Sequence, residues 1–176
     1  TAVSFHEGFD EAAYRERLSA IEKDAQAKAE LEQARLRALV GVGRALAFQN
    51  KQADARGFLE QVCAAPAGSA SRELLAGAYA GLGDVSFAEA RETQAKAAGN
   101  PELKKKSSDL LERALLHYMR VTELYADEAD RGDLLHARSN AARVFASQFQ
   151  LSNDADLEAA TNAMKFFKLA YDMLTA

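Results

Sequence analysis

The sequence has few of the residues that interrupt helices, form disulfides or span membranes. It contains one cysteine, which excludes an internal disulfide framework and a zinc site built on cysteines. Proline interrupts helices, and only two prolines occur among the 176 residues, so long stretches can form uninterrupted helices. Tryptophan is absent. No apolar run approaches the roughly 18 residues of a membrane-spanning helix, and we therefore expect no membrane span. The 26 acidic residues against 22 basic ones give a net charge of −4, which excludes nucleic acid as the expected partner.

Motifs for catalysis and for binding metals or cofactors are also missing. The three histidines have no metal-ligand spacing; they are His6, His117 and His136. Gly41 to Gly43 form half of a dinucleotide fingerprint, but no strand precedes them. No grouping of nucleophile, base and acid can be assembled from the sequence. We interpret Cys63 as a small buried residue, with a redox or nucleophilic role as the alternative. The sequence thus predicts neither an enzyme, nor a cofactor, nor a metal site.

The pattern that is present is helical. Hydrophobic residues make up 48% of the chain and recur at intervals of three and four. Pro66 and the Gly99-Asn100-Pro101 tripeptide mark helix ends. We expect an all-α fold forming a single domain over 1–176, with 1–8 as a loose N-terminus, or a fragment of a longer chain. The predicted helices cover residues 9–25, 27–49, 52–64, 69–98, 101–126, 132–148 and 154–175.

Residues 69–98 can be interpreted as one helix or as two. Gly81 and Gly83 lie inside this segment, and each interior glycine costs about 1 kcal/mol relative to alanine. One apolar stripe nevertheless continues through both glycines; it consists of Leu75, Ala78, Leu82 and Val85. A single elongated helix also preserves the alternation of helices along the chain. We favour one helix and keep two helices as the alternative.

The segment from Leu39 to Pro66 resembles a tetratricopeptide repeat, a helix–turn–helix unit of about 34 residues. Its first helix carries the matching positions Leu39, Val42, Gly43 and Leu46, and its second carries Ala55, Leu59 and Val62. The glycine and the alanine stand where the two helices must cross closely. The resemblance implies a superhelix of about seven to eight antiparallel helices, or three to four hairpins, with an irregular or elongated second unit.

Residues 110–170 are similar to the tetratricopeptide proteins of bacterial cell envelopes. The similarity rests on a helix ALLHYMRVTELY, an acidic turn from Asp127 to Asp133, and an alanine-rich helix after it. The sequence departs from that family at Tyr125-Ala126, where the family has Tyr-Pro. This resemblance slightly favours the bacterial periplasm or cell envelope over the cytoplasm, although the sequence does not fix the compartment.

The resemblance also implies a function, a non-catalytic scaffold that binds a peptide or protein in the inner groove of the repeats. The family's groove positions correspond here to Arg37, Val40, Arg44, Glu73, Gly77, His136, Ser139 and Arg143. Three arginines and one histidine stand there against one glutamate. We therefore expect an acidic partner or a C-terminal carboxylate, because a guanidinium binds carboxylates bidentately.

The last predicted helix supports an alternative function. Its apolar residues cover more than one face, whereas a terminal helix of a repeat array is normally polar outside; they are Met164, Phe166, Phe167, Leu169, Tyr171, Met173 and Leu174. An apolar surface that covers more than one face of this helix predicts a segment of a structural solenoid or a homo-oligomer formed through the C-terminal helix. A regulatory domain that binds a small molecule, or an enzyme, is a more remote alternative.

Overall fold

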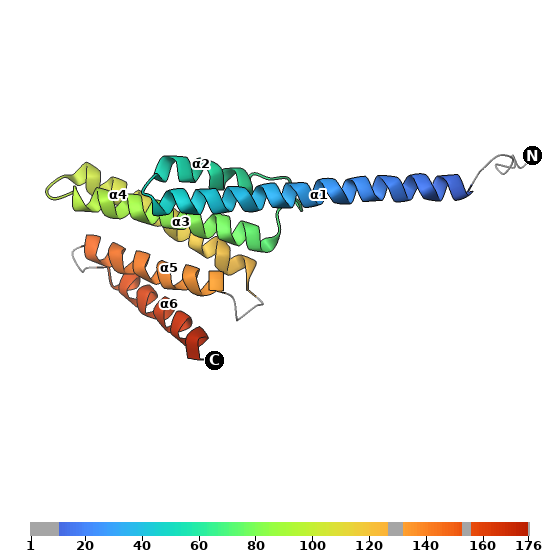
Figure 1. Cartoon of the computed structure of the whole chain (residues 1–176). Coiled ribbons are helices and arrows are strands. Elements are labelled where there is room, and N and C mark those ends of the chain that lie inside the picture. The colour runs from blue at the N-terminus through green and yellow to red at the C-terminus, as the bar shows by residue number, and fades with distance from the viewer. Residues whose placement is uncertain (1–10, 127–131, 153–155, 176) are drawn as a thin grey trace, which may run out of the picture.

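The chain folds into helices joined by short connections (Figure 1). The computed structural model describes residues 11–126, 132–152 and 156–175, with side chains from residue 16 onward, and no strand occurs in these ranges. The six helices described are α1 (Glu11–Phe48), α2 (Gln52–Cys63), α3 (Arg72–Ala95), α4 (Pro101–Leu124), α5 (Gly132–Leu151) and α6 (Leu157–Thr175). The predicted all-α class is therefore confirmed. The predicted loose N-terminus and most of the acidic turn lie outside the described residues.

The predicted break near residue 25 is wrong, because α1 continues through it as one helix of 38 residues. Neither glycine nor proline occurs there, and Ala25, Ala27 and Ala29 favour the helical conformation. An ion pair one turn apart, between Lys28 Nζ and Asp24 Oδ2 at 2.7 Å, adds a small stabilisation. The described helices thus number six rather than seven or eight.

The preferred single helix over residues 69–98 is confirmed as α3, with bounds Arg72–Ala95. Its interior glycines are explained by packing. A Cβ at Gly83 would lie 2.5 Å from Cε1 of Tyr118 on α4, and one at Gly81 would lie 2.9 Å from Cδ1 of Leu59 on α2. Since real side chains do not approach so closely, the absence of a Cβ is what lets α2 and α4 pack against α3.

The ends of α3 and α4 follow local capping rules. Ser71 caps α3 by accepting a hydrogen bond from the Leu74 amide at 3.3 Å. Asn100 caps α4 by accepting bonds from the Glu102 and Leu103 amides at 3.0 and 3.3 Å, and Pro101 is its first residue. Both caps satisfy amides that have no partner inside the helix.

The helices form three successive hairpins, α1–α2, α3–α4 and α5–α6 (Figure 1). Each helix contacts the next one along the chain, and α3 also contacts α1 and α5. One apolar core lies between α1, α2 and α3, and another lies between α3, α4 and α5. Because α3 belongs to both cores, most of its surface is buried, which its alanines and glycines permit.

The N-terminal half of α1 projects beyond the hairpins (Figure 1). Residues 16–31 are exposed on every side, including the apolar Leu18 and Ile21, which are 39% and 64% exposed. Leu36, five turns after Leu18 on the same helix, is fully buried in the core with α2 and α3. Only the second half of α1 thus belongs to the packed array. None of the described helices is both long and apolar enough to cross a membrane.

Candidate binding groove

The candidate site is the surface that α1, α3 and α5 share, since these first helices of the three hairpins are neighbours. All eight residues predicted to line a groove belong to these helices. On α1, Arg37 and Arg44 are exposed. On α5, Arg143 is exposed, while His136 and Ser139 are partly buried. The structure therefore places these residues on helices that lie side by side.

Two predicted groove positions lie elsewhere. Val40 and Gly77 are buried where α1 crosses α3, and a Cβ at Gly77 would lie 3.2 Å from Cγ1 of Val40. In contrast, Val42, which the repeat pattern predicts to pack, is 44% exposed. The predicted register is therefore wrong at three positions: Val40 and Gly77 are buried rather than in the groove, and Val42 is exposed rather than packed. Glu73 is exposed in the first turn of α3, away from the middle of the surface.

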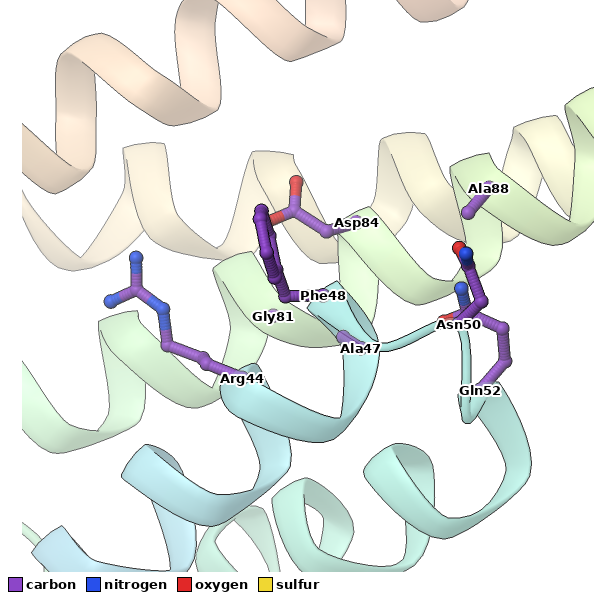
Figure 2. Close-up of a pocket in the computed structure, with 8 residues that line it drawn as sticks. All are labelled: Arg44, Ala47, Phe48, Asn50, Gln52, Gly81, Asp84 and Ala88. Carbon is purple, nitrogen blue, oxygen red and sulfur yellow. The ribbon is translucent and has the colours of Figure 1, made fainter.

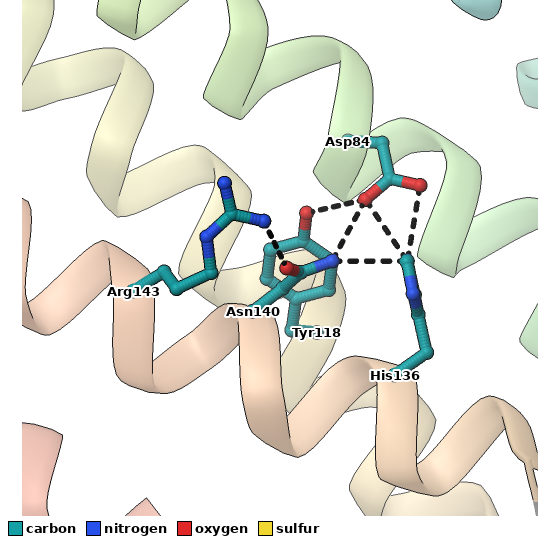
Figure 3. A network of polar contacts seen from close by, with 5 residues as sticks. All are labelled: Asp84, Tyr118, His136, Asn140 and Arg143. Atoms are coloured by element: carbon teal, nitrogen blue, oxygen red, sulfur yellow. Dashed lines mark hydrogen bonds and ion pairs between the residues drawn. The ribbon is translucent and has the colours of Figure 1, made fainter. Parts of the chain in front are cut away.

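A polar network at the centre of this surface joins three helices (Figure 3). Its hub is Asp84 of α3, whose Oδ1 accepts a hydrogen bond from the Tyr118 hydroxyl of α4 at 2.7 Å. From α5, Nδ2 of Asn140 donates to the same oxygen at 3.1 Å, and Nε2 of His136 lies 3.0 Å from Oδ1 and 3.1 Å from Oδ2. Asp84 therefore fixes the positions of α4 and α5 relative to α3.

The donors of the network follow from its chemistry. A carboxylate oxygen only accepts, so Nε2 of His136 carries the proton that it donates to Asp84. The Asn140 amide, 3.0 Å from the same nitrogen, then donates to Asp84 rather than to His136. Burial, together with the charge and the hydrogen bond of Asp84, raises the pKa of Tyr118 far above its usual value. Tyr118 consequently stays a neutral hydroxyl that can keep donating.

Arg143 is held against the network by two contacts. Its Nη1 donates to Oδ1 of Asn140 at 2.9 Å, and its guanidinium lies over the Phe87 ring at 5.2 Å from the ring centre. A cation over an aromatic face is attracted by the ring's quadrupole. Arg143 is thus exposed and yet oriented. Such a guanidinium can bind a carboxylate at a lower cost in side-chain entropy than a mobile one.

Beside the network lies a pocket of about 430 Å³ between the end of α1, the start of α2 and α3 (Figure 2). Arg44 lies at one end, Asn50 and Gln52 lie at the other, and Phe48 and Asp84 lie between them. Arg44 makes no hydrogen bond or ion pair with any residue of the described ranges. Asp84 lines the pocket and anchors the network, and so it joins the two into one site.

Asp84, Asn140 and Phe48 are absent from the residues predicted from sequence. Asp84 carried a usable signal, because it is the only charged residue in the largely apolar segment of α3 between Glu73 and Glu89. Its partners carried none, since the hydroxyl and the amide that bond to it come from residues 34 and 56 positions further along the chain.

A second cluster lies between α2, α3 and α4, apart from the groove. The rings of Tyr79 and His117 stack at 6.2 Å. Burial and the nearby Arg56 and Arg113 lower the pKa of His117 to about 4. Burial and the charge of Glu60 raise the pKa of Cys63 to about 11. Cys63 is partly rather than fully buried, and since the thiolate is the reactive form, the raised pKa lowers the reactivity of its thiol at neutral pH.

Groups of three or more potential metal ligands are absent from the ranges that the structure describes. Comparisons with known proteins add no family to this site: no family model matches the chain, and neither a curated protein nor a solved structure matches it significantly.

Proposed function

We propose that this chain is a non-catalytic protein-interaction module that binds a peptide or protein segment in the groove formed by α1, α3 and α5. The observation that supports it best is the convergence of polar side chains from three successive hairpins on one surface. Arg44 comes from the first hairpin, Asp84 from the second, and Arg143 from the third. Such a surface spans the array, and a peptide lying across it would contact all three hairpins.

The charges of the groove favour an acidic segment or a C-terminal carboxylate as the ligand. Arg44 has no partner within the described chain, and Arg143 bonds only to a neutral amide, so both guanidinium groups can accept a carboxylate. The hub carboxylate, Asp84, already receives three donors. In this proposal the hairpins follow each other as in a tetratricopeptide superhelix, with α1, α3 and α5 as the groove helices.

The test is affinity capture from the source organism followed by mass spectrometry. Wild-type protein is compared with the double variant Arg44→Glu/Arg143→Glu and with the control variant Arg17→Glu, which changes an exposed arginine on the projecting half of α1. We expect a partner that the wild type and the control enrich and the double variant loses. Equal recovery by all three proteins would exclude this groove as the binding site.

A second candidate function is self-association through α6. Five apolar side chains of this helix are between 47% and 74% exposed; they are Leu157, Met164, Phe167, Tyr171 and Leu174. Their spacing repeats every seven residues, as in the seam between two packed helices. We propose this surface as a contact to a second copy or to a further repeat unit, in addition to the groove.

A further inference from the structure

We infer that the pocket between Arg44 and Gln52 takes a basic side chain, lysine or arginine, from the same peptide whose carboxylate Arg44 binds. This inference rests on the proposed function and makes it more specific, because the ligand becomes a segment of mixed charge. The pocket is defined by its lining residues, which include Arg44, Phe48, Asn50, Gln52 and Asp84. We call the part of the pocket that the last four residues line, from its middle to the end opposite Arg44, the acceptor end.

Asp84 supplies the charge at the acceptor end. A carboxylate has about four lone-pair sites for donors. Three donors crowd Oδ1, whereas Oδ2 has a single contact, 3.1 Å from Nε2 of His136. Oδ2 therefore keeps a free acceptor site, and the donors on Oδ1 fix its direction. A fixed, unsaturated carboxylate oxygen on a residue that lines a pocket is suited to an ammonium or guanidinium group.

Gln52 supplies a second acceptor. Its Oε1 is buried and has no hydrogen-bond donor within the described chain. Buried polar atoms are nearly always paired, so an acceptor without a donor is costly unless something supplies one. Lysine and arginine side chains carry three and five N–H donors and no acceptor, so either can supply the donor that Oε1 of Gln52 lacks.

Phe48 supplies an aromatic face. It is the last residue of α1, it lines the pocket, and its side chain is 92% exposed. Figure 2 shows its ring next to the Asp84 carboxylate. A ring this exposed contributes almost nothing to the core. Over such a ring a cation is attracted, while its aliphatic stem covers apolar surface.

Arg44 decides which cations fit. Its own positive charge, at the opposite end of the pocket, repels a ligand that carries only positive charge. A peptide whose carboxylate pairs with Arg44 removes that repulsion and can then place its basic group at the acceptor end. The pocket thus selects an acidic and a basic residue close together in one segment, rather than a purely acidic one.

The test is binding to an array of short peptides that pair one aspartate with one lysine at varied spacing, each matched by a copy carrying Nε-acetyl-lysine. We expect the lysine peptides to bind roughly threefold to tenfold more tightly than the acetylated copies at the best spacing. Phe48→Ala should reduce that preference, and Asp84→Asn should abolish it. The spacing series also identifies how far apart the two charged residues must be.

Phe48→Ala keeps the test valid even if Asp84→Asn disturbs the network, because the Phe48 ring lies outside the core. Peptides that bind through Arg44 and Arg143 without any preference for lysine over acetyl-lysine would overturn this inference alone. A preference that both variants leave unchanged would overturn it as well. Failure of every peptide to bind, while affinity capture still recovers a partner that Arg44→Glu/Arg143→Glu loses, would overturn this inference and leave the proposed function in place. Failure of both experiments would overturn the two together.

Discussion

At the scale of single residues, glycine has two different roles in these helices. Gly83 lies at a helix crossing, where a Cβ would meet the Tyr118 ring at 2.5 Å, whereas a Cβ at Gly41 would meet no atom within 4 Å. The Tyr118 ring cannot move aside easily, because its hydroxyl is bonded to Asp84 at 2.7 Å. Packing thus requires Gly83, and nothing in the described structure requires Gly41.

The first prediction compares these two positions. Gly83→Ala should lower the free energy of unfolding by about 1–3 kcal/mol, because the added methyl group forces the crossing apart. Gly41→Ala should raise it by up to about 1 kcal/mol, since alanine favours an open helical position. Urea denaturation of both variants measures the difference. Equal effects of the two substitutions would contradict the role assigned to the crossing.

The second prediction concerns His117 and acid. Its pKa in the folded protein is about 4, below the ordinary 6.5, so the unfolded chain takes up a proton that the folded chain does not. This stability is fully present above pH 6.5 and is lost as the pH falls toward 4. Because the imidazole is only partly buried, solvent screening limits the loss to about 1–2 kcal/mol. Replacing the imidazole by a neutral ring, His117→Phe, should remove this part of the pH dependence. Unfolding curves between pH 7 and 4 provide the check, and identical slopes for the two proteins would refute the assignment.

At the scale of helices, α1 consists of two halves with different roles. The second half packs on α2 and α3 through Leu36, while the first half is exposed from residue 16 onward, and the exposure continues to Leu31. An isolated helical stretch is only marginally stable in water, and its alanines and the ion pair between Asp24 and Lys28 support it. The first half can therefore unfold locally without loss of the core.

The third prediction uses two leucines of this helix. Leu36→Ala should cost about 2–5 kcal/mol of stability, because it leaves a cavity in the core. Leu31→Ala, at a side chain that is 72% exposed, should change stability by less than about 0.5 kcal/mol. Hydrogen exchange should show weak protection before residue 31 and strong protection after residue 36. Uniform protection along α1 would mean that the first half is stabilised by contacts that the structure does not show.

Local signals predict the helices well, and contacts between distant segments explain what sequence reasoning missed. The cap at Asn100 and the start at Pro101 depend on three consecutive residues, and both were predictable. Val40 and Val42 are both apolar, and only the crossing with α3 decides that Val40 is the buried one. Asp84 became recognisable as a hub only when α4 and α5 were in place around it.

At the scale of the whole molecule, two candidate surfaces lie on different helices. The groove residues belong to α1, α3 and α5, while the exposed apolar stripe belongs to α6. The net charge of −4 opposes association of two copies through charge alone, so any self-association must depend on apolar contact. The two surfaces can therefore be changed independently.

The last prediction tests the groove and the α6 stripe separately. Met164 and Tyr171, 68% and 64% exposed, lie seven residues apart on the α6 stripe, so Met164→Lys/Tyr171→Lys charges it without touching the core. In light scattering, the wild type should gain mass with concentration and this variant should remain a monomer. In the peptide array, the α6 variant should bind as the wild type does, while Arg44→Glu/Arg143→Glu should lose peptides and still associate. A wild type that stays monomeric at every concentration would exclude α6 as a self-association surface and leave the groove as the single candidate site.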